Sequence, residues 1–99
     1  MHELRIDRYI IDTLMPDLVG HDKRPSALLV YLFLSGQTAG TRGRKVTASL
    51  RDVADGTGLS KRGVQQALQL LERRRLVSRT KTVPTSVAVY EVLRPWRKR

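Results

Sequence analysis

The stretch LRDVADGTGLSKRGVQQALQLLERRRL, residues 50–76, contains two short helical patterns separated by a tight turn. The first pattern predicts a helix that ends at Gly58, because glycine accepts the left-handed backbone of a helix end. Ser60 is expected to cap a second helix that continues to about Arg74. The inward-facing apolar residues of this second helix recur on one side: Val64, Ala67, Leu68 and Leu71. The outward side is polar and carries no acidic residue between Ser60 and Leu71, which favours contact with an anionic partner.

The positive charge of the chain is concentrated in the half that contains this stretch. The 99 residues carry a formal net charge of +10, with −1 in residues 1–41 and +11 in residues 42–99. A charge needed only for solubility has no reason to be segregated in this way. DNA, RNA or an anionic membrane surface are the natural partners of such a half.

The N-terminal region predicts a first helix over residues 7–19. Its apolar residues cover more than half of the helix circumference. Pro16 is expected to kink or divide the helix near Met15, because proline lacks the N–H of a helical hydrogen bond. Gly20 is the expected stop.

A second helix is predicted to begin near Asp22, as N-cap, with Pro25 in its first turn. Residues 27–34 are apolar on all sides, which is typical of a central helix covered by its neighbours. A strand is the competing interpretation of this run. The proline at its start and the Ser35–Gly36 pair at its end favour a helix.

Residues 35–44 predict a glycine-rich basic loop, and residues 45–48 a short strand. Ser49 and Asp52 then have the spacing of a capping box, in which two residues at a helix start exchange hydrogen bonds.

The last third of the chain changes to β-branched residues. Residues 76–82 and 87–92 predict an antiparallel hairpin joined by a turn at residues 83–86. Tyr90 alternates with apolar neighbours and is expected to face inward. A basic tail, residues 93–99, is expected to be a mobile arm, and Trp96 within it to contact the core or an interface.

Residues 45–92 resemble a winged helix-turn-helix, similar to MarR-like and related bacterial DNA-binding domains. The residues that carry the resemblance are small or apolar and have the spacing of that motif: Ala54, Gly58, Leu59, Val64 and Ala67. The resemblance implies an α+β fold that is mainly α with a small β-hairpin. A three-helix core with a wing would be extended by one extra N-terminal helix.

On this interpretation residues 1–99 form a single domain. Its parts are the N-terminal helix 1–21, the winged-helix core 22–92 and the basic tail 93–99. The implied function is sequence-specific binding of double-stranded DNA by a small transcriptional regulator. The recognition helix, residues 60–74, would enter the major groove, and the wing, residues 76–92, would contact the backbone or minor groove.

Candidate base-reading residues lie on the outward side of the second helix: Ser60, Lys61, Arg62, Gln65, Gln66 and Gln69. Arginine and lysine suit guanine acceptors, and glutamine can pair with adenine through two hydrogen bonds. The competing interpretation is an ordinary solvated helix face.

Candidate contacts to the DNA backbone come from the loop, the first helix cap, the recognition helix and the wing: Arg42, Arg44, Lys45, Ser49, Arg73, Arg79, Lys81 and Thr82. Cations and hydroxyls are the usual phosphate ligands. The run at residues 73–75 has an equally good structural explanation, because cations at a helix C-terminus offset the helix dipole.

An enzyme is not expected, because no nucleophile–base pair and no glycine-rich phosphate motif can be recognised. His2 and His21 lack partners at metal-ligand spacing, and the chain has no cysteine. We therefore expect no metal, no cofactor and no evident small-molecule effector. The longest apolar run is too short for a membrane span, so the expected location is cytoplasmic, at the nucleoid.

Two other classes of function remain open. A basic RNA- or ribosome-associated protein would fit the charge, although single-strand binding favours exposed aromatic residues, of which the chain has few. A winged helix can also serve as a replication, partition or protein-interaction adaptor, which the strong positive charge disfavours.

The apolar arc of the N-terminal helix, residues 1–21, is wider than one core contact requires. We therefore expect a homodimer through this helix, which would place two recognition helices about 34 Å apart on one duplex. The competing interpretation is that this helix only covers the second helix of its own chain.

Overall fold

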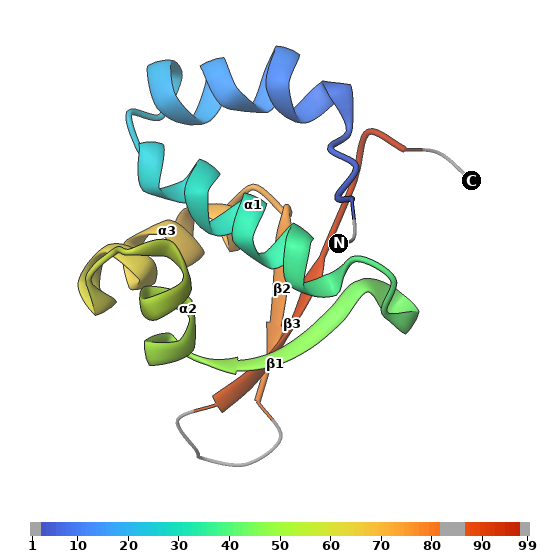
Figure 1. The fold of residues 1–99 in the computed structure, drawn as a ribbon. Helices are drawn as coiled ribbons and strands as arrows, with labels where there is room; N and C mark the ends of the chain where they lie inside the picture. Colours follow the sequence, from blue (N-terminus) through green and yellow to red (C-terminus); the bar gives the residue numbers. More distant parts are fainter. Residues whose placement is uncertain (1–2, 82–86, 98–99) are drawn as a thin grey trace.

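The computed structural model describes residues 3–81 and 87–97, and it is mainly helical with a small antiparallel sheet (Figure 1). This confirms the predicted α+β class. Within the described ranges no helix is long and apolar enough to cross a bilayer. The elements after the N-terminal helix are, in chain order, α1 (Pro25–Thr38), the 3₁₀ turn η3 (Arg42–Arg44), β1 (Lys45–Ser49), α2 (Leu50–Thr57), α3 (Lys61–Arg73), β2 (Val77–Thr80) and β3 (Val87–Val92).

The N-terminal helix covers residues 8–21 and includes two π-helical segments, η1 (Ile10–Leu14) and η2 (Asp17–His21). Pro16 was predicted to kink or divide this helix near Met15; it lies between η1 and η2, and the chain stays helical through it, with φ −64° and ψ −31°. The prediction of a stop at Gly20 is wrong, because that residue lies inside η2.

α1 begins and ends later than the sequence predicts. Its N-cap is Arg24 rather than Asp22, which pairs instead with a distant arginine described below. The helix continues past Gly36 to Thr38, a fully buried residue. The Thr38 hydroxyl donates to the Leu34 carbonyl oxygen at 2.8 Å, so its polar group is satisfied inside the helix.

The two helices of the central stretch have the predicted boundaries. In the capping box, the Ser49 hydroxyl accepts from the Asp52 amide at 3.0 Å, and the Ser49 amide donates to the Asp52 carboxylate at 2.9 Å. Gly58 ends α2 with φ 81°. α2 also contacts α1 closely at Gly56, where an added Cβ would lie 2.1 Å from the Phe33 ring.

α3 ends in a Schellman motif, the paired hydrogen bonds that close many helix C-termini. The Leu76 amide donates to the Leu71 carbonyl at 2.8 Å, and the Arg75 amide donates to the Glu72 carbonyl at 3.0 Å. Arg75 has φ 59°, a left-handed conformation in which glycine is the usual residue.

The sheet has the strand order β1-β3-β2, and both pairs are antiparallel. The predicted hairpin is therefore confirmed for β2 and β3, while its turn, residues 82–86, lies outside the described residues. The pairing of β1 with β3, from Lys45 opposite Glu91 to Ser49 opposite Val87, was not predicted.

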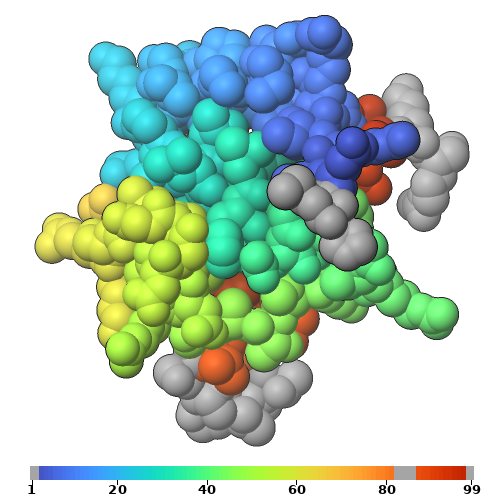
Figure 2. Space-filling model, viewed as in Figure 1, coloured from blue at the N-terminus to red at the C-terminus, as the bar shows by residue number. Residues whose placement is uncertain are grey.

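The core lies around α1, and Figure 1 shows the N-terminal helix, α1 and the sheet stacked in that order. The N-terminal helix buries Ile10, Leu14 and Leu18, and Figure 2 shows its contact with α1 as one continuous surface. From the sheet, Tyr90 is 2% exposed, as predicted. The interpretation that the N-terminal helix covers α1 within one chain is thus correct for this face.

The two ends of the described chain meet beside α1. The Trp96 ring stacks on Tyr9 at a centroid distance of 4.5 Å, and its indole N–H donates to the Asp7 carboxylate at 3.0 Å. The Arg97 Nε donates to the same carboxylate at 2.8 Å. Residues 93–97 are therefore held against the N-terminal segment, and the predicted mobile arm is wrong for them.

Candidate nucleic-acid interface

The outward face of α3 is polar and exposed. The inward residues are fully buried, as predicted: Val64, Ala67, Leu68 and Leu71. Four of the candidate base-reading residues are exposed on the other side: Lys61, Arg62, Gln65 and Gln69. A helix bound to its own core on one side and to solvent on the other can present these side chains to a partner without disturbing the fold.

The remaining two candidates make hydrogen bonds within the chain. The Ser60 hydroxyl accepts from the Gly63 amide at 3.0 Å, which is the predicted N-cap. The Gln66 side-chain oxygen accepts from the Arg24 guanidinium at 2.9 Å and is half-buried. Both residues therefore have structural roles: Ser60 is exposed but caps α3, and Gln66 is held by Arg24.

A groove of about 350 Å³ lies between the starts of α2 and α3 and the strand β2. Its walls are formed by Ser49, Leu50, Arg51, Lys61, Arg79, Lys81 and Tyr90. Four of these residues are cations, and among the described residues no carboxylate lines the groove. Such a groove concentrates anions, because like charges on its walls raise the local positive potential.

Three local features bring these cations together. Ser49 ends β1 and caps α2, which places Arg51 in the first turn of that helix. Lys61 opens α3 directly after its Ser60 cap. Ser49 pairs with Val87 in β3, and Thr80 pairs with Val89, so β1 and β2 reach the same end of the sheet, where Lys81 follows.

Arg79 is partly neutralised by the protein itself. Its guanidinium lies 3.3 Å from the Glu72 carboxylate at the end of α3. The pKa of the neighbouring Tyr90 hydroxyl lies above its ordinary value because the group is buried, although a hydrogen bond with the Arg79 guanidinium acts in the opposite direction. The predicted role of Arg79 as a phosphate ligand is thus combined with an internal ion pair, whereas Lys81 is exposed beside it.

The other candidate backbone contacts do not join this groove. Arg42, Arg44 and Lys45 lie at or before the start of β1, and Ser49 lies at its end. A strand advances by about 3.3 Å per residue, so Lys45 and Ser49 are about 13 Å apart. Arg42, Arg44 and Lys45 therefore lie outside this groove, and Thr82 lies outside the described residues.

Arg73 is exposed in the last turn of α3 and lines a separate shallow hollow. This hollow includes Asp22 and also Arg24, Gln66 and Gln69. It is away from the four cations of the groove, so Arg73 extends the positive surface only along the far end of α3.

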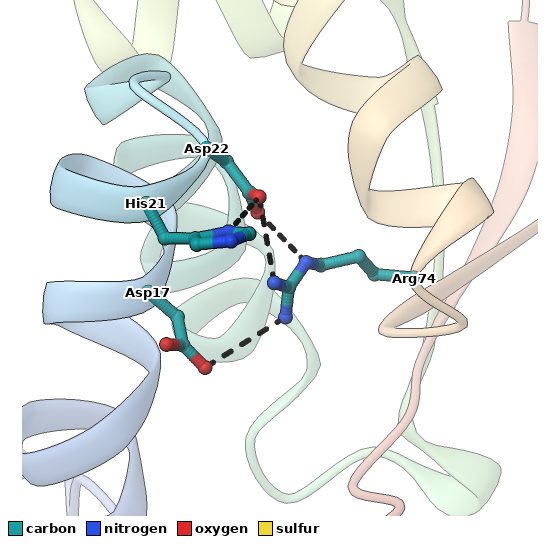
Figure 3. A network of polar contacts seen from close by, with 4 residues as sticks. All are labelled: Asp17, His21, Asp22 and Arg74. Carbon is teal, nitrogen blue, oxygen red and sulfur yellow. Dashed lines mark hydrogen bonds and ion pairs between the residues drawn. The ribbon is translucent and has the colours of Figure 1, made fainter.

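Arg74 has a structural role, as Figure 3 shows. Its Nε lies 2.7 Å from the Asp22 carboxylate, and its Nη1 lies 3.9 Å from Asp17. His21 Nδ1 is 3.0 Å from the other Asp22 oxygen. Burial raises the pKa of Asp22, but hydrogen bonds from His21 and Arg74 together with the Arg74 charge outweigh it, so the pKa lies below its ordinary value.

Sequence reasoning missed two cations near α3. Arg51 lines the groove, and Arg24 orders Gln66. Arg51 carried no sequence signal for this position, because connectivity places the end of α2, not its first turn, beside the start of α3. Arg24 also carried no such signal, because it contacts a residue 42 positions away.

Within residues 3–81 and 87–97 no group of three or more His, Cys, Asp or Glu side chains is placed to hold a metal ion. Comparisons of this chain with protein-family models, with curated proteins and with solved structures find no match.

Proposed function

We propose that this chain is a winged helix-turn-helix domain that binds double-stranded DNA, as a small transcriptional regulator. α2 and α3 would form the helix-turn-helix, with α3 in the major groove. The β2–β3 hairpin would be the wing, on the backbone or minor groove.

The observation that carries the proposal is the continuity of the exposed α3 face with the cationic groove. Lys61 belongs to both, because it starts α3 and lines the groove. An α3 inserted in a major groove would direct Arg62, Gln65 and Gln69 toward base edges. The duplex backbone beside that major groove would then lie along Arg51 and Lys81.

The experiment begins with selection of a preferred site from random duplexes, followed by fluorescence anisotropy with wild type and variants. Arg62→Ala and Gln65→Ala should each weaken binding to the selected site by about 1–3 kcal/mol and relax the base preference at one position. Gln37→Ala is the matched control, because Gln37 is an exposed glutamine on α1. It should bind like wild type.

Three results would overturn this proposal. One is that both α3 variants bind the selected duplex as tightly as wild type. Another is that single-stranded or duplex RNA competes as well as DNA, which would favour the RNA-associated alternative. The third is a folded protein that no duplex binds at low salt, which would favour the adaptor alternative.

The homodimer is a second proposal. The N-terminal helix buries one apolar side against α1, but Ile11 remains 42% exposed and Val19 38% exposed. Leu29 on α1 adds a further apolar side chain that is 46% exposed. Sedimentation at micromolar concentration should show a mass above 11.3 kDa that rises with concentration. An unchanged monomer, alone and on a duplex with two half-sites, would contradict the dimer.

A further inference from the structure

A cavity of about 620 Å³ lies at the C-terminal end of α1. In Figure 1 this region, where the N-terminal segment and the chain end meet, is on the opposite side of the picture from α3. The volume is in the range of pockets that bind small molecules. The cavity is thus separate from the proposed DNA surface.

The charge of the cavity wall is strongly positive. Its ionised residues are Arg5, Arg8, Arg44, Arg94 and Arg97 together with Glu3 and Asp7. The Asp7 carboxylate already accepts hydrogen bonds from the Trp96 indole, the Arg97 guanidinium and the Tyr9 amide. These contacts leave an excess of cations facing the cavity.

Arg44 is one of these cations, and its backbone conformation is unusual. It has φ 53° and follows Gly43, which has φ 72°. A left-handed conformation is costly for a residue with a Cβ, and such residues are concentrated at functional sites. The Arg44 side chain lines the cavity.

Two hydrogen-bond donors at the cavity have no acceptor among the described residues. They are the buried Nε of Arg44 and the buried hydroxyl of Ser35. Burial lowers the pKa of Arg44, and repulsion from Arg94 and Arg97 lowers it further. A buried donor without an acceptor is costly, and an anion in the cavity would relieve the repulsion among Arg44, Arg94 and Arg97.

We propose that this cavity binds a small organic anion, whose phosphate or carboxylate group lies among Arg44, Arg94 and Ser35. The apolar part of the molecule contacts the aliphatic wall formed by Leu4, Ile10 and Leu32. This site would bind a small molecule, whereas no small-molecule effector was expected from the sequence. It does not depend on the proposed binding of DNA.

The test is a titration of the ¹⁵N-labelled full chain, followed by amide and indole chemical shifts. The probes are hexyl phosphate, hexanoate, hexan-1-ol and inorganic phosphate. Hexyl phosphate or hexanoate should shift the Ser35 and Arg44 amides and the Trp96 indole, and the better of the two identifies the source of the oxyanion. Hexan-1-ol at the same concentration should leave them in place. Shifts confined to α3, or equal affinity for inorganic phosphate, would overturn the proposal.

The deciding variant is Arg44→Gly, because glycine accepts the left-handed backbone and the fold should be retained. It should weaken binding of the better probe about tenfold or more, since a charge-assisted hydrogen bond is lost. Arg42→Gly is the matched control, with the same charge loss on the same turn but outside the cavity wall. It should bind within about twofold of wild type. Equal losses in both variants, or none in Arg44→Gly, would contradict the site. Arg94→Ala provides a second test if Arg44→Gly does not fold.

Discussion

Removal of the groove cations tests whether this groove contacts a DNA backbone. The triple variant Arg51→Ala, Lys61→Ala, Lys81→Ala removes three of its four cations. Arg79 is retained, because its pair with Glu72 contributes to the end of α3. All three replaced side chains are exposed, so the fold should be unaffected.

The expected change in the salt dependence of DNA binding follows from the number of cations removed. Each phosphate contact contributes about 0.9 to the slope of log K against log salt, because a bound counterion is released. Loss of three contacts should therefore reduce the slope by about 2.7. At about 0.1 M monovalent salt this change in slope corresponds to a decrease of roughly 500-fold in the DNA-binding constant.

The assay is fluorescence anisotropy with one duplex at five salt concentrations between about 0.05 and 0.3 M, a range over which phosphate contacts change affinity strongly. The matched control is Arg5→Ala, Arg8→Ala, Lys23→Ala, which has the same loss of net charge at exposed positions outside the groove and outside the candidate backbone contacts. Its slope should stay within about 0.5 of wild type. If both triple variants lose the same slope, only net charge matters, and the assignment of the groove to the DNA backbone is refuted.

Three further predictions concern the fold. Alanine normally stabilises a helix by about 1 kcal/mol relative to glycine. Gly56→Ala should instead lower the free energy of unfolding by about 1–3 kcal/mol, because the new Cβ meets the Phe33 ring. Urea unfolding should show that this loss of stability is recovered when Gly56→Ala is combined with Phe33→Leu. Hydrogen bonds from Trp96 and its neighbours lower the pKa of Asp7 to about 2, so their contribution to stability is present above the ordinary pKa and is lost as the pH falls toward 2; between pH 4 and 2 the wild type should lose stability more steeply than Asp7→Asn, by urea unfolding read from tryptophan fluorescence. Arg75→Gly should raise the free energy of unfolding by up to about 1 kcal/mol, because the left-handed backbone at this position suits glycine. The urea midpoint should therefore rise, and an unchanged or lower midpoint would contradict the strain at Arg75.

The elements that could be predicted from the sequence depend on contacts between near neighbours. Ser49 and Asp52 exchange hydrogen bonds across three residues, and the Gly63 amide donates to the Ser60 hydroxyl over the same spacing. Gly58 ends α2 through its own backbone conformation. Each of these interactions joins residues within one turn of helix, so it can be recognised from the local sequence. The order and type of the elements from residue 45 onward were therefore predictable.

The errors concern residues whose partners are distant in the sequence. Asp22 has the chemistry of an N-cap, but an ion pair with Arg74, 52 residues away, determines its position. Periodicity also cannot show which exposed polar residues are already bonded, and Gln66 was counted as a base reader for that reason. The candidate site could be located on α3, but its division into bonded and exposed residues required the packing of α1 against α3.

The contact of Trp96 and Arg97 with Asp7 also concerns how the chain folds. The hydrogen-bonded pairs are 89 and 90 residues apart, so they close a loop of almost the whole described chain. The entropic cost of closure grows with loop length, and contacts of this separation are not expected to form until the structure between them is in place. We expect this junction to form late during folding and to open locally before the helices do. Because the same junction forms one wall of the anion cavity, an opening of the chain ends would also be the route by which a ligand enters and leaves.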